Sequence, residues 1–157
     1  MKFRPAILLD IIGSFPAGSA GIPDKTGIYI AYAGKRDING AFWPSRLLYV
    51  GKSEDTSENR GVAGRVYDHA RSDHQEWLKY LRTDEEIRYA YIPIEGMWQD
   101  KIPHIEAAMI NAFKPSFNDE HKDAIREDLR LEETIKLQGY IWCLPDFSIS
   151  PDSLTYK

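Results

Sequence analysis

Two short segments rich in aromatic and β-branched residues constrain the fold most strongly. Residues 27–34 (GIYIAYAG) alternate in the way that a strand requires, and residues 46–52 (RLLYVGK) form a second strand-like segment. The polar stretch between them carries turn signals at Asn39-Gly40 and Trp43-Pro44. Because successive strands joined in this way pair antiparallel, the sequence predicts a hairpin with a long tip.

The remaining pattern predicts one more strand and several helices. Residues 85–94 alternate again and predict the third strand of an antiparallel sheet. Apolar spacing predicts helices over 5–13, 62–72, 74–84, 103–113 and 119–139, and residues 140–147 an edge strand before a ten-residue tail. The fold class expected is therefore α+β: a small antiparallel three-stranded sheet flanked by helices, with N- and C-terminal helical extensions.

Length and composition indicate an ordinary soluble protein. With 157 residues the chain is expected to be a single domain, with a core over 27–118 and extensions over 1–26 and 119–157. The single cysteine, Cys143, cannot form an intramolecular disulfide, which favours a cytoplasmic location. Asp10 interrupts the N-terminal apolar run, so we expect no membrane association.

The formal net charge of −4 argues only weakly against a nucleic-acid partner. Residues 119–133 contain seven acidic and three basic side chains, which gives −4 for this segment. The rest of the chain then carries 17 charges of each sign, because the totals are 24 acidic and 20 basic. One acidic segment accounts for the whole excess, so a DNA-binding face elsewhere is compatible with the composition.

Polar side chains lie in the predicted strands and helices at positions where packing alone does not require them. Arg65 and His69 are four residues apart, so they project from the same face of a helix. Glu106 lies in the first turn of an otherwise apolar helix, where a carboxylate is costly unless it is paired or bound to a metal. The full set of candidate catalytic residues is Tyr29, Tyr49, Arg65, His69, Glu106 and Asn118.

These residues, taken in order, resemble the GIY-YIG nuclease family. The resemblance begins with Gly27-Ile28-Tyr29 and Tyr49-Val50-Gly51, and continues through Gly64-Arg65 with His69 one turn later. It ends with Glu106 on the following long helix and Asn118 after Lys114-Pro115. Each tripeptide alone is weak evidence, whereas five ordered elements of matching type are a strong signal. The resemblance covers residues 27–118.

The resemblance implies a divalent-metal-dependent DNA endonuclease and assigns a role to each residue. Tyr29 would orient or deprotonate the attacking water beside Tyr49, although a phenol ordinarily titrates near pH ~10. Lys52 resembles a lysine that some members use to lower that pKa. Arg65 would stabilise phosphoryl charge, His69 would assist the nucleophile or hold a phosphate oxygen, and Asn118 would bridge backbone and site.

The family also implies a cofactor and partners. Glu106 would be the sole direct protein ligand of Mg²⁺ or Mn²⁺, a hard cation that keeps its waters. Lys35, Arg36, Lys52 and Arg71 are the expected nucleic-acid-binding residues. Cutting both strands of DNA with one site per chain favours a homodimer on the DNA. The 19 residues between Tyr29 and Tyr49 are more than most members have, which leaves the recognised substrate open.

The same residues also have ordinary structural interpretations. Taken singly, each candidate is an ordinary strand aromatic, surface arginine, structural histidine or turn residue, and Glu106 would only favour the helix dipole by ~0.3–1 kcal/mol. Two further function classes stay open. One is a catalytically inactive nucleic-acid or protein-binding module of the same fold, and the other is an inhibitor whose acidic helix mimics DNA.

Overall fold

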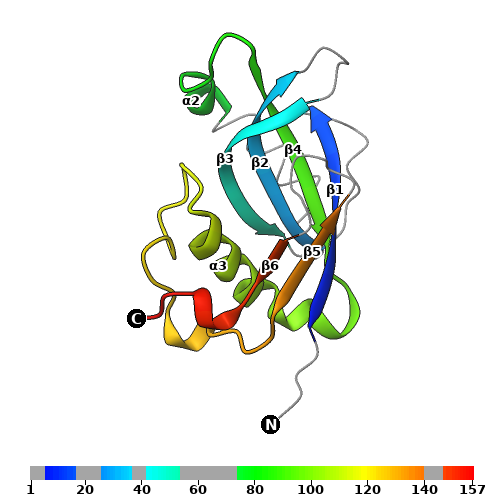
Figure 1. Ribbon diagram of the computed structural model, residues 1–157, viewed down its shortest axis with the longest axis vertical. Coiled ribbons are helices and arrows are strands. Elements are labelled where there is room, and N and C mark those ends of the chain that lie inside the picture. Colours follow the sequence, from blue (N-terminus) through cyan, green and yellow to red (C-terminus); the bar gives the residue numbers. More distant parts are fainter. Residues whose placement is uncertain (1–5, 17–25, 37–41, 54–73, 140–146) are drawn as a thin grey trace.

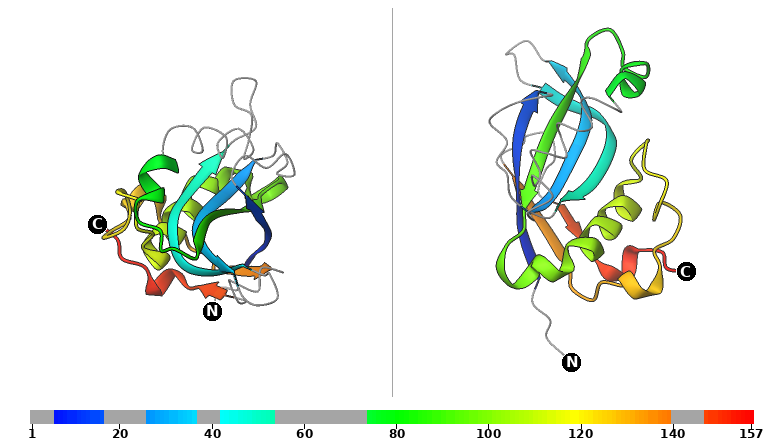
Figure 2. Two further views of the ribbon diagram at one scale, coloured as in Figure 1. Left: turned by 90° about the horizontal axis from the view of Figure 1, so that it is seen from above. Right: turned by 180° about the vertical axis from the view of Figure 1, so that it is seen from behind.

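The computed structural model describes residues 6–16, 26–36, 42–53, 74–139 and 147–157. Their strands form one mixed sheet of six, in the order β3-β2-β4-β1-β5-β6. The strands are β1 Ile7–Pro16, β2 Gly27–Arg36, β3 Phe42–Ser53, β4 Glu85–Pro93, β5 Ile135–Gly139 and β6 Phe147–Ile149. Figure 2 shows that the sheet curves strongly. The prediction of a small three-stranded sheet flanked by helices is therefore wrong.

The antiparallel hairpin predicted from residues 27–52 is confirmed. β2 pairs with β3 from Gly27 opposite Ser53 to Arg36 opposite Phe42. The third predicted strand, β4, pairs antiparallel along the other edge of β2. β2 is thus covered by a neighbour on each side, and its residues 27–34 are buried on both faces of the sheet.

The N-terminal segment is a strand, although a helix over 5–13 was expected. β1 lies between β4, with which it pairs antiparallel, and β5, with which it pairs parallel. Its side chains alternate with period two, the pattern of a strand: Ile7, Leu9 and Ile11 are buried, and Leu8, Asp10 and Ile12 are exposed. The apolar residues on both faces hid this alternation in the sequence.

The acidic helix expected over 119–139 is also absent from the described residues. Only Glu127–Leu129 form a short 3₁₀ turn, η2, and Ile135–Gly139 pair with β1 and β6 as strand β5. The predicted C-terminal tail is structured as well. It contains the end of β6, the 3₁₀ turn η3 (Pro151–Ser153) and a parallel bridge between Ile125 and Tyr156. Most of the predicted edge strand, residues 140–146, lies outside the described residues.

Helix α3 (Ile102–Phe113) is the longest helix of the described residues and confirms the helix predicted over 103–113. It follows the 3₁₀ turn η1 (Gly96–Lys101), has Pro103 in its first turn, and ends at Lys114 in the left-handed conformation. The side chains of Ile105, Ala108 and Met109 join the core cluster on one face of the sheet. Figure 1 shows α3 beside the end of β3.

The other helices contribute less to the described structure. α2 (His74–Leu78) covers only the first half of the helix predicted over 74–84. Its Trp77 is buried against a second core cluster, which lies on the opposite face of β2 and includes Tyr29, Ala31 and Ala33. The helix predicted over 62–72 lies outside the described residues. No helix in the described parts of the chain is long and apolar enough to cross a bilayer.

Candidate active site

A bulge in β3 places the Tyr49 side chain on the same face of the sheet as Tyr29. Ala31 lies opposite Tyr49 and Tyr32 opposite Leu47, so Leu48 is an extra residue on β3. Leu48 and Tyr49 consequently both join the cluster around Tyr29, although they are neighbours in sequence. The Tyr49 ring lies 6.0 Å from the Tyr29 ring, centroid to centroid. The opposite side of Tyr49 stacks on Trp77, with centroids 5.9 Å apart.

The segment that follows α3 is held against the outer edge of β3. Asn118 Oδ1 accepts from the Val50 N–H at 2.9 Å, and Asn118 Nδ2 donates to the Val50 carbonyl at 2.9 Å. The N–H groups of Ser116 and Phe117 donate to the carbonyls of Leu47 and Leu48. These bonds satisfy backbone groups that an edge strand would otherwise expose. They also bring the loop after Asn118 to Tyr49.

A cavity of about 210 Å³ opens where β3, α3 and this loop meet. Three of its lining residues are predicted catalytic residues from separate parts of the chain: Tyr49, Glu106 and Asn118. The others are Ile110, Phe117, Asp119, Glu120 and His121. Glu106 is half-buried in α3, and Asn118 is 6% exposed. The fold therefore gathers half of the predicted catalytic set around one cavity.

Tyr29 does not line this cavity. It is fully buried, and its hydroxyl lies over Gly51, where an added Cβ would be 2.2 Å from Tyr29 Oη and 2.2 Å from Cζ. Gly51 is thus the residue that leaves room for the Tyr29 side chain. Of the two tyrosines, Tyr49 is the partly exposed one, and the buried Tyr29 ring packs against it.

The predicted nucleic-acid-binding residues lie in different places. Lys52 is exposed at the end of β3, next to the cavity-lining segment. Lys35 lies toward the hairpin tip at the other end of β2, and pairs with Asp84 at 3.1 Å. Arg36 is the last residue of β2. The structure does not bring Lys35 and Lys52 together.

Three predicted site residues, Arg65, His69 and Arg71, lie outside the described residues. Their roles stay predictions from the sequence.

His121 is a site residue that sequence reasoning missed. Its backbone is left-handed (φ 66°), and its carbonyl accepts from Asn111 Nδ2 at 2.9 Å. Burial lowers the pKa of His121 below its usual 6.5, and Arg126, Lys157 and Lys52 lower it further, while Glu120 raises it. The Nε2 atom lies 3.7 Å from Glu120 Oε2. In the sequence, only its place three residues after Asn118 hinted at this position.

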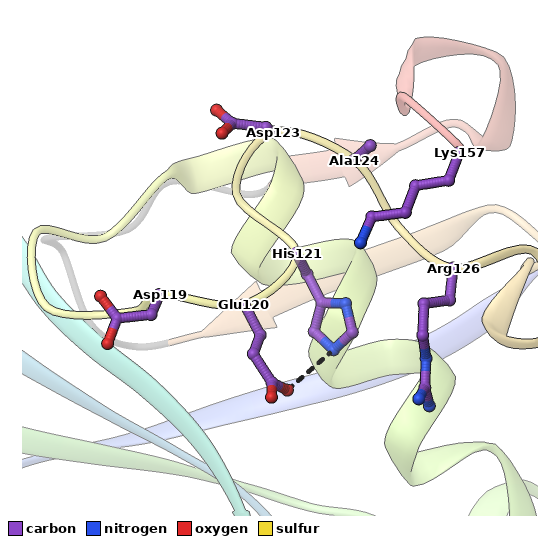
Figure 3. Close-up of a pocket in the computed structure, with 7 residues that line it drawn as sticks. All are labelled: Asp119, Glu120, His121, Asp123, Ala124, Arg126 and Lys157. Carbon is purple, nitrogen blue, oxygen red and sulfur yellow. Dashed lines mark ion pairs between the residues drawn. The ribbon is translucent and has the colours of Figure 1, made fainter.

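A second cavity, of about 340 Å³, adjoins the first and shares Asp119, Glu120 and His121 with it (Figure 3). The cations Arg126 and Lys157 line this second cavity. Among the described residues, no lysine or arginine lines the first one, which instead has the carboxylates of Glu106, Asp119 and Glu120. The second cavity also has three carboxylates, those of Asp119, Glu120 and Asp123, so the two cavities differ in charge by the two cations.

The first cavity has the chemistry to hold a hard divalent cation. Carboxylate oxygens are the ligands that Mg²⁺ and Mn²⁺ prefer, and Mg²⁺ usually keeps several of its waters. No group of three or more metal-ligating side chains occurs in the described parts of the chain, so the cavity does not offer a complete ligand cage. It fits a cation held by Glu106 and otherwise hydrated.

Comparison with protein-family models, with curated proteins and with solved structures gave no match.

Proposed function

We propose that this chain is a divalent-metal-dependent endonuclease that hydrolyses DNA phosphodiester bonds in the Tyr49–Glu106–Asn118 cavity. The observation that carries the proposal is the convergence of these three side chains, from β3, α3 and the following loop, on one cavity. The residues were selected from the sequence by their resemblance to GIY-YIG nucleases. Asn118 and Tyr49 also have structural roles, whereas a half-buried carboxylate such as Glu106 is costly unless it is paired or bound to a metal.

Each described residue has a role that follows from its contacts. Glu106 would hold Mg²⁺ or Mn²⁺, which would supply charge neutralisation for the phosphate. Tyr49 lines the cavity, and its hydroxyl would orient the attacking water by accepting or donating a hydrogen bond. Tyr29 is a positioning residue, because it is buried beneath Tyr49 and does not reach the cavity.

Asn118 is a second positioning residue. Both of its polar atoms are used on the Val50 backbone, so it fixes the distance between Tyr49 and the loop 119–121. Arg65 and His69 complete the proposed mechanism from the sequence alone: Arg65 stabilises the phosphoryl charge and His69 assists the nucleophile. One active site per chain cuts one strand, so cleavage of both strands involves a homodimer on the DNA, which light scattering of the complex tests.

The structure bears differently on the two alternative functions, an inhibitor that mimics DNA and a catalytically inactive binding module. An inhibitor that mimics DNA with an acidic helix loses its basis, because residues 119–139 do not form that helix in the described structure. A catalytically inactive binding module of the same fold stays as the competing outcome. Such a module would bind DNA without cutting it, whether or not Mg²⁺ or Mn²⁺ is present.

The test is nicking of supercoiled plasmid in Mg²⁺ or Mn²⁺ by the wild type and by Glu106→Ala and Arg65→Ala. The control is Asp100→Asn, which removes the charge of an exposed carboxylate in the turn η1, outside the cavity. We expect nicking by the wild type and the control, loss of nicking in the other two variants, and none in EDTA. Nicking that survives both substitutions, or no nicking by the wild type, overturns the proposal.

A further inference from the structure

We propose that the second cavity, whose lining includes His121, Arg126 and Lys157, binds a backbone phosphate of the DNA. This phosphate belongs to the strand that is cut and neighbours the scissile phosphate. That the ligand is DNA rests on the proposed function. The two cavities share the wall formed by Asp119, Glu120 and His121, so a strand in one can continue into the other. Neither the GIY-YIG resemblance nor the predicted nucleic-acid-binding residues include this cavity.

Two positively charged side chains of the second cavity, those of Arg126 and Lys157, could bind an anion beside His121. Figure 3 shows the Lys157 ammonium and the Arg126 guanidinium on the same side of the loop as the His121 ring. The carboxylates of Asp119 and Asp123 point away from that ring, whereas Glu120 points toward it, with its Oε2 atom 3.7 Å from His121 Nε2. No carboxylate in the described part of the chain forms an ion pair with Lys157, so its charge is available to a ligand. Arg126 pairs only loosely with exposed Asp128, at 3.4 Å.

The electrostatic influence on His121 supports the same cluster independently. Burial is the main cause of the lowered pKa of His121; Arg126, Lys157 and Lys52 lower it further, and Glu120 raises it. Of the three cations, Arg126 and Lys157 line the same cavity as the ring. A phosphate against this ring would interact with both of these positive charges, and Lys52 lies at the end of β3 nearest the first cavity.

The backbone segments that carry the two cavity cations are hydrogen-bonded to each other. Ile125 N–H donates to the Thr155 carbonyl at 2.8 Å, and Lys157 N–H donates to the Ile125 carbonyl at 2.9 Å. Arg126 directly follows Ile125, so Arg126 and Lys157 extend from adjacent, bridged segments. Asn111 ties both segments to α3, because it donates to the His121 carbonyl and accepts from the Thr155 N–H.

The test measures DNA affinity by fluorescence anisotropy with a short labelled duplex in EDTA, where no metal-dependent cutting interferes. The double variant Arg126→Ala/Lys157→Ala is compared with the wild type between about 50 and 200 mM NaCl. The matched control is Arg82→Ala/Lys136→Ala, which removes the same charge from exposed positions after α2 and on β5. We expect the slope of log affinity against log salt to decrease in magnitude by about 1 for the cavity variant and to stay unchanged for the control.

Equal slopes for the two double variants overturn the inference, as does a wild type that binds no DNA. The plasmid-nicking assay reports on the proposed function separately. If the wild type binds DNA and the cavity variant shows the expected smaller slope, but the wild type does not nick plasmid, the nuclease is refuted and the phosphate site stands. A wild type that nicks but shows no difference between the double variants refutes only the phosphate site.

Discussion

Replacing Asn118 with alanine removes both hydrogen bonds that hold the loop after α3 against β3. Val50 is fully buried, and its N–H and carbonyl point to the outer edge of the sheet, where Asn118 pairs with both at 2.9 Å. Leaving a buried backbone group unpaired costs about 1–3 kcal/mol. The loss of two partners therefore predicts a decrease of about 2–6 kcal/mol in the free energy of unfolding for Asn118→Ala.

Urea unfolding followed by tryptophan fluorescence measures this decrease, as a lower midpoint with an unchanged slope. The control is Gln138→Ala, which truncates an exposed amide on β5 and should stay within about 0.5 kcal/mol of the wild type. A loss below about 1 kcal/mol for Asn118→Ala would contradict the reasoning, because it would mean that the Val50 groups find other partners or are solvated.

Asn118→Asp separates the donor from the acceptor. The substitution keeps an oxygen that accepts from the Val50 N–H, but places a second oxygen against the Val50 carbonyl. Burial and that carbonyl raise the pKa of the introduced carboxyl, since both disfavour its charged form. The folded state then binds its proton more tightly than the unfolded state, so the deficit relative to wild type is largest near neutral pH and shrinks in acid. A deficit that does not vary with pH sinks this interpretation.

Three further substitutions follow from single contacts. Gly51→Ala places a Cβ 2.2 Å from the buried Tyr29 ring, so the thermal midpoint should fall by the equivalent of about 1–3 kcal/mol, and an unchanged midpoint refutes the packing described. Burial lowers the pKa of His121 below 6.5, so the unfolded state takes up the proton first and stability falls as the pH drops below 6.5. His121→Asn, which tolerates the left-handed backbone, should remove part of this pH dependence, and an identical pH profile argues against it. Asn111→Ala should speed hydrogen exchange of the Thr155 amide, whose N–H it accepts at 3.0 Å, and an unaltered exchange rate rejects the clamp.

The central hairpin, β4 and α3 were predictable because their signals are local. Residues 27–34 combine β-branched and aromatic side chains with period two, and Pro103 and Lys114-Pro115 bound the helix on both sides. Three candidate site residues, Tyr49, Glu106 and Asn118, lie on or directly after these elements. Their meeting at one cavity follows from elements that the sequence describes well.

The two terminal segments were mispredicted because their structure depends on each other. β1 and β5 pair parallel, and neither has its partner nearby in the sequence. A short apolar run such as residues 7–12 fits a helix or a strand by periodicity alone. Residues 119–139 are rich in good helix formers, but the burial of Ile125, Leu131 and Ile135 at spacings of six and four residues fits no single helix face. Long-range pairing overrode local propensity in both segments.

The role of His121 was hidden for a similar reason. Its position depends on a left-handed turn and on Asn111, ten residues earlier in α3, and on Lys52, Arg126 and Lys157 from distant segments. No local motif encodes such a cluster, so only the folded chain reveals it.

The central claim is most directly tested by the rate of plasmid nicking in Mn²⁺ for the wild type and Glu106→Gln. Loss of the only proposed protein ligand removes several kcal/mol of stabilisation, and each ~1.4 kcal/mol is tenfold in rate. We therefore predict a rate at least about 100-fold lower for Glu106→Gln, with an unfolding midpoint close to that of the wild type. Equal rates for the two proteins would contradict the assignment of this cavity as a metal-dependent nuclease site.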